Sequence, residues 1–167
     1  AAPVFLQSVV EEECTGNGAL ACLARGYRAE AALIPEPFAE TLVSAQVGVL
    51  WFQVHLKGLP THVAYAGEGA NAIEAAPAIF AALHALEHRW NAPARRSPDF
   101  ASHDHALNLN IGRIRGGDWT SSVPAWCVFD VRMGVFPGQD LTEARAEITE
   151  TVMAAARDIP FLRNALP

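Results

Sequence analysis

The stretch Thr41–Lys57, TLVSAQVGVLWFQVHLK, predicts a long β-strand. Its residues alternate between two faces, and apolar side chains extend over both faces along much of it. After a loop at 58–69, the segment Asn71–Trp90 reads NAIEAAPAIFAALHALEHRW, with apolar residues at helical spacing. Asn71 can cap this helix, and Glu74 three residues later makes a capping-box start. The two segments predict a strand followed by an amphipathic helix.

The rest of the chain continues the same domain. Asn91–His105 is rich in Pro, Arg, Ser, Asp and His and indicates a surface loop. Strands are predicted at Ala106–Arg115 and Ala125–Gly134, and a second amphipathic helix at Asp140–Asp158. The order β-α-β-β-α is that of the split-βαβ, ferredoxin-like plan, so the predicted fold class is α+β. That plan ends in one more strand, which we expect beyond Pro167.

Residues 1–38 have a different pattern. Short β-prone segments at 3–10 and 30–35 flank a helical segment at 19–26 that stops at a glycine. This order predicts a β-α-β piece with parallel strands buried on both faces. Two strands and one short helix bury too little surface to be stable alone. We therefore expect residues 1–38 to be a partial α/β domain, and residues 39–167 to be a second domain that lacks its last strand.

Composition excludes several classes of function. The chain has 167 residues, a formal net charge of −6 and no basic stripe, which argues against nucleic-acid binding. It has no apolar run of the roughly 20 residues that span a bilayer, and its first residues lack the charged start of a signal peptide. Its three cysteines, Cys14, Cys22 and Cys127, are widely spaced and fit reduced thiols. We expect a cytoplasmic protein without a membrane or nucleic-acid partner.

Carboxylates gather at two predicted strand ends. Glu11-Glu12-Glu13 follow the first predicted strand, where three adjacent negative charges repel one another unless a cation is bound. The carboxyl ends of parallel strands are also where α/β enzymes collect ligands. One interpretation is a general base beside a metal ligand, and the other is a solvated acidic turn. Glu36 lies between two prolines, which indicates either a fixed carboxylate or an exposed residue of an interdomain hinge.

Two further motifs lie in the second domain. Residues 58–73, GLPTHVAYAGEGANAI, form a Gly-rich loop with one histidine, His62, that runs into a helix start. Residues 111–132 contain Gly-Arg-Ile-Arg-Gly-Gly, then Ser-Ser-Val-Pro, then Asp-Val-Arg. Taken alone, the first motif is explained by a flexible connection with a chance histidine. The second is explained by two strands with surface arginines and a loop between them.

In this order, the four motifs resemble the family of zinc-dependent aminoacylases, acetylornithine deacetylases, succinyl-diaminopimelate desuccinylases and carboxypeptidase G peptidases. The matching patterns are an acidic turn with two glutamates, a Glu-Pro, the stretch from Gly-x-x-x-His-x-Ala to Gly-x-Asn-Ala-Ile, and the series Gly-Gly, Val-Pro and Asp-x-Arg. They cover nearly the whole chain and are nearest to the deacetylase and desuccinylase branch. The resemblance implies a dimerisation, or lid, domain preceded by a piece of a zinc-peptidase catalytic domain.

The resemblance also implies catalytic and metal-binding roles. Glu12 would take a proton from a metal-bridging water as the general base. Glu13 and Glu36 would each ligate one of two zinc ions, for which cobalt or manganese could substitute. His62 would reach into the active site of the partner in a homodimer and stabilise the oxyanion of the tetrahedral intermediate.

Two more residues would contact the substrate. Arg132 would bind the substrate carboxylate bidentately, and Ser121 would be a weak substitute for an asparagine that many members have. The implied reaction is hydrolysis of an N-acyl amide or peptide bond in a small amino-acid-like or dipeptide-like substrate. The family's remaining ligands, a histidine and a bridging aspartate upstream and a histidine downstream, have no counterpart here. We therefore expect the chain to be inactive by itself, as part of a longer hydrolase.

Two alternatives are open at this point. The first is a stand-alone dimerisation or binding module without catalysis. The second is a helix-borne zinc protease, because residues 84–88, His-Ala-Leu-Glu-His, fit the H-x-x-E-H motif with both histidines on one helix face. An ordinary amphipathic helix explains the same residues. Residues 103–105, His-Asp-His, are expected to be a solvated part of the loop.

Overall fold

A computed structural model describes residues 3–36 and 41–163 of the chain. The chain divides into two compact units, Ala1–Leu42 and Val43–Pro167. The predicted domain boundary, between residues 38 and 39, lies outside the described residues and stays a prediction. None of the helices in the described ranges has the length and apolar character needed to cross a bilayer.

The described residues of the first unit form one helix and no strand. The helix, α1, spans Asn17–Ala24, two residues earlier at both ends than predicted. The predicted strands at 3–10 and 30–35 are wrong for this structure, since neither segment forms a strand. The physical reason is that a strand needs a neighbour to take its backbone N–H and C=O groups. Neither segment has such a neighbour among the described residues, so the β-α-β piece does not form.

The second unit is built on an antiparallel sheet of three strands in the order β1-β3-β2. β1 spans Gly48–Lys57, β2 spans Leu109–Gly116, and β3 spans Trp126–Val135. The central strand, β3, pairs with both of the others. β1 starts later than predicted: residues 42–47 are not in a strand, and the strand begins at Gly48. The expected last strand lies outside the described residues.

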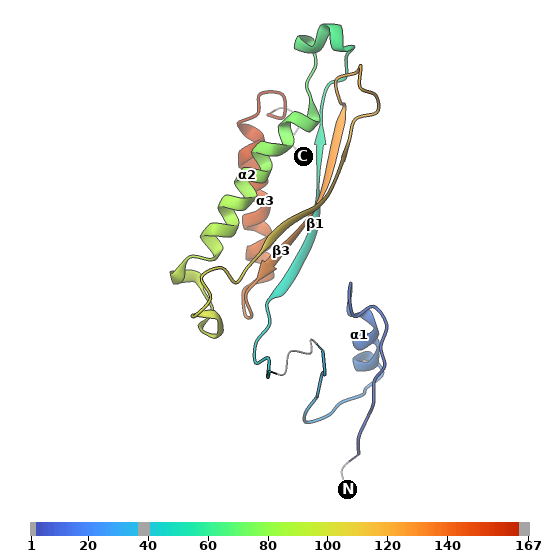
Figure 1. The fold of residues 1–167 in the computed structure, drawn as a ribbon, viewed down its shortest axis with the longest axis vertical. Coiled ribbons are helices and arrows are strands. Elements are labelled where there is room, and N and C mark those ends of the chain that lie inside the picture. Colours follow the sequence, from blue (N-terminus) through green and yellow to red (C-terminus); the bar gives the residue numbers. More distant parts are fainter. Residues whose placement is uncertain (1–2, 37–40, 164–167) are drawn as a thin grey trace. The chain divides into compact units, whose positions relative to one another are not determined.

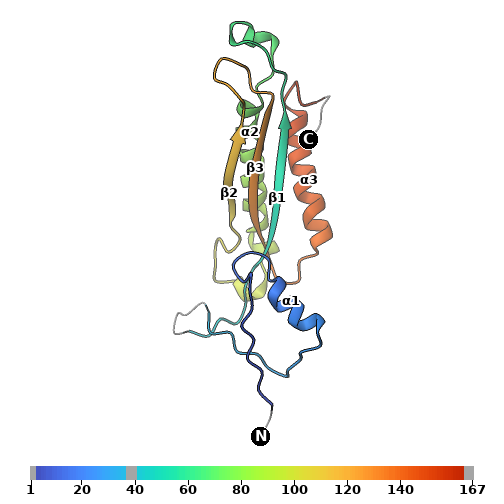
Figure 2. The same ribbon diagram turned by 90° about the vertical axis from the view of Figure 1, so that its right-hand side faces the viewer.

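Two helices cover one face of this sheet. α2 spans Ala72–Trp90 and α3 spans Leu141–Arg157, and both lie on the same side of the strands (Figures 1 and 2). Asn71 caps α2 as predicted, since its side-chain oxygen accepts the main-chain N–H groups of Ile73 and Glu74. The resulting order, β-α-β-β-α, confirms the predicted α+β fold class.

The core lies between the sheet and the helices. On β3 the odd-numbered residues 127–135 are buried, and the even-numbered ones up to 132 are partly exposed. Val54 and Leu56 of β1 continue the buried face. The ring of Phe80 on α2 meets that of Phe129 edge to face, with 4.8 Å between the centroids. The opposite face of the sheet is open, so it can carry polar and functional side chains.

A buried carboxylate joins α2 to the start of β2. Glu87, 6% exposed, accepts the main-chain N–H of Leu109 at 2.7 Å, and a ring nitrogen of both His84 and His105 lies 3.0 Å from it. Burial raises the pKa of Glu87, but hydrogen bonds from His84, Leu109 and His105, and the charge of His105, bring it below its ordinary value. His105, predicted to be solvated, is therefore a structural partner of Glu87.

We expect Glu87→Ala to lower the free energy of unfolding by about 3 kcal/mol at pH 7, because the buried N–H of Leu109 loses its acceptor. A carboxylate with a lowered pKa stabilises the fold above its unfolded pKa, and this contribution is lost as pH falls through the folded value. The difference between the two proteins should therefore shrink only in acid. Urea unfolding between pH 3 and 8 measures it.

The matched control for Glu87→Ala is Glu74→Ala, which removes an exposed glutamate from the first turn of the same helix. This control should change the free energy of unfolding by no more than about 0.5 kcal/mol. Equal effects of the two substitutions at pH 7 would show that Glu87 does not anchor β2.

Candidate functional site

The predicted metal-binding carboxylates lie on exposed turns of the first unit. Glu11 adopts the left-handed conformation, with φ 62°, and its carbonyl accepts the main-chain N–H groups of Thr15 at 3.2 Å and Gly16 at 2.9 Å. Its carboxylate accepts the Thr15 hydroxyl at 2.5 Å. Glu12 and Glu13 follow with exposed side chains. The turn thus engages Glu11 and leaves the next two carboxylates exposed.

A complete metal site is not formed by the described part of the chain. No three His, Cys, Asp or Glu residues in residues 3–36 and 41–163 come together in a way that could hold an ion. The side chain of Glu36 is exposed. Pro37, the second residue of the predicted Glu-Pro motif, lies outside the described residues. The carboxylates of Glu13 and Glu36 have the right chemistry for zinc, but two ligands are too few for a tight site.

A tip at one end of the sheet carries His62. The segment around it pairs with the stretch before β3: the N–H of Val63 bonds to the carbonyl of Ser121 at 3.0 Å, and the N–H of Val123 bonds to that of Thr61 at 2.9 Å. A short 3-10 helix, η1 (Val63–Glu68), follows directly. The structure therefore brings two of the predicted site residues, His62 and Ser121, onto neighbouring backbone segments.

The ring of His62 is oriented by its own turn. Its Nδ1 accepts the main-chain N–H of Ala64 at 3.1 Å and so caps η1. When Nδ1 accepts, the proton of the neutral ring is on Nε2. The His62 side chain is exposed, and within the described residues Nε2 has no hydrogen-bond partner. The tip thus presents one oriented N–H donor to solvent.

The base of this tip requires a glycine, Gly58, because two backbone segments approach it closely. A Cβ at this position would collide with the carbonyl oxygens of Ala70 and Pro124, which approach from two sides. The N–H of Gly58 also bonds to the carbonyl of Ala125 at 2.7 Å. Two backbone segments therefore pack against residue 58 closely enough that only glycine fits.

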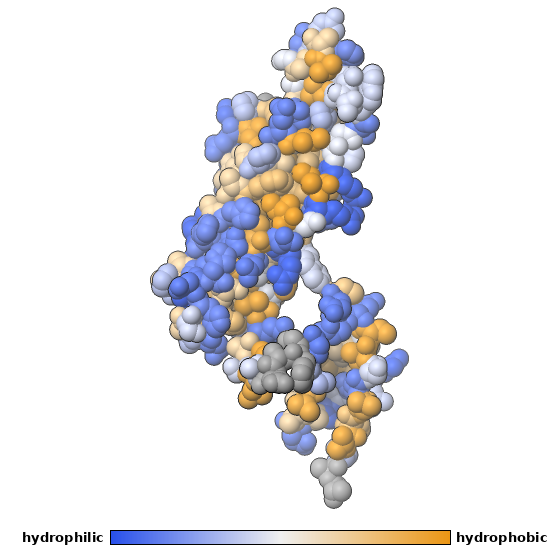
Figure 3. All heavy atoms as spheres, viewed as in Figure 1, coloured by the Kyte–Doolittle hydropathy of each residue, from blue (hydrophilic) through white to orange (hydrophobic). Residues whose placement is uncertain are grey.

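The loop segments of the tip that hold His62 also carry exposed apolar side chains. Leu59, Val63, Tyr65 and Trp119 are each more than half exposed. Hydrophobic spheres are visible at this end of the second unit, which is at the top in Figure 3. Such exposed side chains around an oriented polar group are typical of a surface that meets another molecule.

Arg132 lies elsewhere, on the open face of the sheet. It is opposite Trp51 of β1 and Asn110 of β2 in the register. Arg132 is six positions along β3 from Trp126, so it lies roughly 20 Å from the end of the strand nearest the tip. One copy of the chain therefore does not bring Arg132 together with His62.

Near Arg132, β2 contains a β-bulge that was not predicted from the sequence. The bulge determines which arginine pairs with Asp130. The bulge lies between Ile111 and Arg113 of β2 and places Arg113 opposite Asp130. Nε of Arg113 is 3.3 Å from the Asp130 carboxylate, which also accepts the Gln53 side-chain N–H at 2.5 Å. The glycine inside the predicted strand, Gly112, was the available signal for a bulge.

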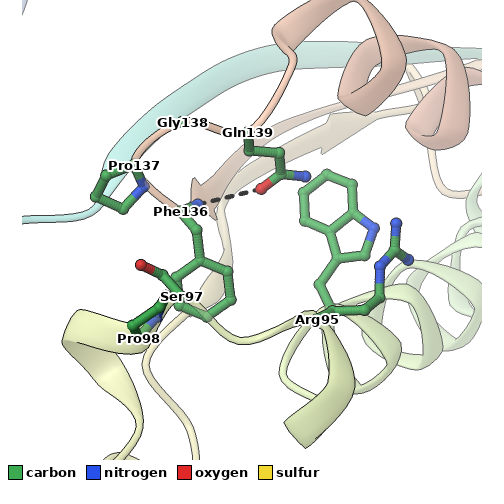
Figure 4. A pocket seen from close by; sticks show the side chains of 8 residues that line it. Arg95, Ser97, Pro98, Phe136, Pro137, Gly138 and Gln139 are labelled. Atoms are coloured by element: carbon green, nitrogen blue, oxygen red, sulfur yellow. Dashed lines mark hydrogen bonds between the residues drawn. The ribbon is translucent and has the colours of Figure 1, made fainter.

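A cavity of about 320 Å³ lies at the other end of the second unit, away from these residues. Trp90 contributes to its wall. So do Phe136 and Gln139, which are labelled in Figure 4. Arg95 also lines it, but its guanidinium binds both carboxylate oxygens of Glu147 at 3.0 and 2.9 Å. Because Arg95 is already paired, this cavity lacks a free charged group that would define a ligand.

Residues 44–160 match the family model of the peptidase dimerisation domain. This match covers most of the second unit, including the tip with His62 and the open face with Arg132. The chain therefore belongs to the peptidase dimerisation domain family, and the resemblance found in its sequence is confirmed.

Hydrolases are among the similar proteins. The chain is 30% identical over 161 residues to an acetylornithine deacetylase of Myxococcus xanthus, covering 95% of this chain and 41% of the relative. It is 32% identical over 166 residues to a probable carboxypeptidase of Aspergillus clavatus, covering 95% and 36%. The chain thus spans about two fifths of the length of these relatives.

A solved structure supports the fold. The aminobenzoyl-glutamate utilization protein of Klebsiella pneumoniae superposes with a TM-score of 0.50 and 21% sequence identity, over 68% of this chain and 26% of that one. At this identity the similarity shows the shared fold alone.

Proposed function

We propose that this chain is part of a metal-dependent amidohydrolase that cleaves an N-acyl amide or peptide bond of a small amino-acid-like substrate. The observation that carries the proposal is the exposed ring of His62, oriented by the bond from the Ala64 N–H to its Nδ1, on the tip of a peptidase dimerisation domain. A fixed N–H donor suits the oxyanion that forms when an amide carbonyl is attacked. The deacetylase and carboxypeptidase relatives support the same class of reaction.

The first unit supplies the acid–base chemistry in this proposal. Glu13 and Glu36 each contribute one carboxylate to a pair of metal ions, zinc or its substitutes cobalt and manganese, with the other ligands outside this chain. When bound, such ions supply an activated water. Glu12 holds the proton taken from the attacking water on its carboxylate and releases it to the leaving amine.

The second unit supplies the contacts to the substrate. His62 donates its Nε2–H to the carbonyl oxygen as negative charge develops there. Arg132 binds the substrate carboxylate through its guanidinium, and Ser121 adds a polar contact near the tip. Because His62 and Arg132 lie at different places on one chain, we propose a homodimer in which His62 serves the partner's site. In the described part of the chain β2 is an edge strand of the sheet, and this edge is available for strand pairing between two copies.

A reducing compartment fits the cysteines. Cys14, Cys22 and Cys127 are free thiols, and burial raises the pKa of Cys127, which keeps it protonated and unreactive. We therefore keep a cytoplasmic location as part of the proposal.

The proposed function is tested by hydrolysis of N-acetyl amino acids by the whole protein that contains this chain. We expect turnover that is lost on dialysis against a chelator and restored by zinc. Sedimentation should show that the protein is a dimer throughout. The chain 1–167 alone should be inactive, since it supplies only two ligands. A metal-loaded whole protein that is dimeric but hydrolyses none of a panel of N-acyl amino acids and dipeptides would favour the stand-alone binding module.

A further inference from the structure

We propose that Trp51 and Arg132 form one subsite on the open face of the sheet, which selects substrates that carry an apolar side chain next to their carboxylate. The inference rests on the proposed function, because it takes Arg132 as the carboxylate-binding residue. It adds a specificity-determining residue, Trp51, and a substrate class.

Arg132 has no acidic partner in the described residues. Asp130, two residues earlier on the same face, is held by Arg113 at 3.3 Å and by Gln53 at 2.5 Å. The bulge in β2 creates this pairing by moving Arg113 opposite Asp130. A guanidinium without a carboxylate partner on a protein surface is well suited to a planar, bidentate anion such as a substrate carboxylate.

Trp51 is the cross-strand neighbour of Arg132. The two residues are directly opposite in the β1–β3 register, which places their Cβ atoms about 5 Å apart on the same face. The indole is 59% exposed although it sits in the middle of a strand. A ligand whose carboxylate binds Arg132 would therefore place its adjacent side chain against the indole. The flat apolar ring favours an aromatic or branched aliphatic group there.

The charge of the open face supports an anionic ligand. It carries Arg113, Arg115, Arg132 and Lys57 on its strands, against one carboxylate, that of Asp130. The chain as a whole has a formal net charge of −6. Positive charges therefore outnumber negative ones along this face, although Lys57 lies at the far end of β1, and this balance favours an anionic ligand over a cationic one.

The test is a binding titration of the whole protein in its metal-free form, so that no turnover occurs. The probe is the indole N–H signal of Trp51 in a proton–nitrogen NMR spectrum, assigned with Trp51→Phe. The ligands are N-acetyl-L-phenylalanine, N-acetyl-L-alanine and N-acetyl-L-phenylalaninamide. The buried indole N–H of Trp90, which bonds to Glu147 at 2.9 Å, is the internal reference.

N-acetylphenylalanine is expected to shift the Trp51 signal and to bind about tenfold more tightly than N-acetylalanine, while the amide without a carboxylate binds at least tenfold more weakly. Equal affinities for the three ligands would overturn the subsite. A Trp51 signal that no ligand moves, as when another part of the whole protein covers the indole, would overturn it too.

Kinetics then separate this inference from the proposed function. Trp51→Ala should lower kcat/KM for N-acetylphenylalanine about tenfold and leave that for N-acetylalanine within about twofold. A protein that hydrolyses both substrates with the same loss in Trp51→Ala refutes the subsite and leaves the proposed function intact. A protein that shows the binding preference but no hydrolysis refutes the function alone.

Discussion

Glu12→Gln is expected to lower kcat for amide hydrolysis by the whole protein about 10³-fold. Glutamine keeps the shape of glutamate and its position on the exposed turn, but it cannot take the proton of the attacking water. KM should change little, because Glu12 is proposed to act on the water and not on the substrate. The measurement is steady-state hydrolysis of an N-acetyl amino acid with a zinc content equal to that of the unmodified protein.

The matched control is Glu11→Gln in the same turn. The Glu11 carboxylate already accepts the Thr15 hydroxyl, and its backbone sets the turn with φ 62°. Glutamine at this position keeps an acceptor oxygen for Thr15, so kcat should stay within a few-fold of the unmodified value. Equal losses in the two variants would mean that the acidic turn acts only through its overall charge, and the assignment of Glu12 would be wrong.

His62→Ala is expected to lower kcat by about 10²- to 10³-fold, because the oxyanion loses its Nε2–H donor. KM should change much less, since the donor acts mainly on the charge that develops in the transition state. Thr61→Ala, next to His62 in the same loop, tests for general damage to the tip, since only the main-chain carbonyl of Thr61 is used in the pairing with Val123.

Mixed dimers decide whether His62 acts across the subunits. Glu12→Gln and His62→Ala chains, each inactive alone, are unfolded and refolded together in equal amounts. If His62 serves the partner, each heterodimer has one competent site, so the mixture recovers about a quarter of the unmodified activity. If His62 serves its own chain, every site in the mixture lacks one residue and no activity returns. The second result would refute the proposed exchange and leave His62 catalytic within one chain.

Much of the second unit could be predicted from the sequence, because its signals are local. Apolar residues at helical spacing and a polar cap defined α2 and α3, and alternation defined the strands, each to within a few residues except at the start of β1. The motif order also led to the correct family. The strand predictions at 3–10 and 30–35 failed because strand formation is not local. An extended segment becomes a strand only when another strand pairs with it.

The sequence predicted which residues belong to the candidate site, but not how these residues lie relative to one another. The pattern singled out His62 and Ser121 separately, and only the folded tip shows them on paired backbone segments, with Nδ1 of His62 used as a cap. The H-x-x-E-H motif has a different explanation in the structure. Glu87 is buried and engaged by Leu109 and His105, residues distant in the sequence, so its role is structural.

For the second unit, the order of helices and strands and the family could be read from the sequence, since propensity, periodicity and motif spacing are properties of neighbouring residues. Which charged side chains have an ion-pair partner depends on the tertiary structure. A bulge near Gly112 shifts Arg113 onto Asp130, and this pairing leaves Arg132 beside Trp51 without an acidic partner in the described residues. The cross-strand register is fixed only when the apolar face of each strand packs against the helices, and that packing joins three segments that are distant from one another in the sequence.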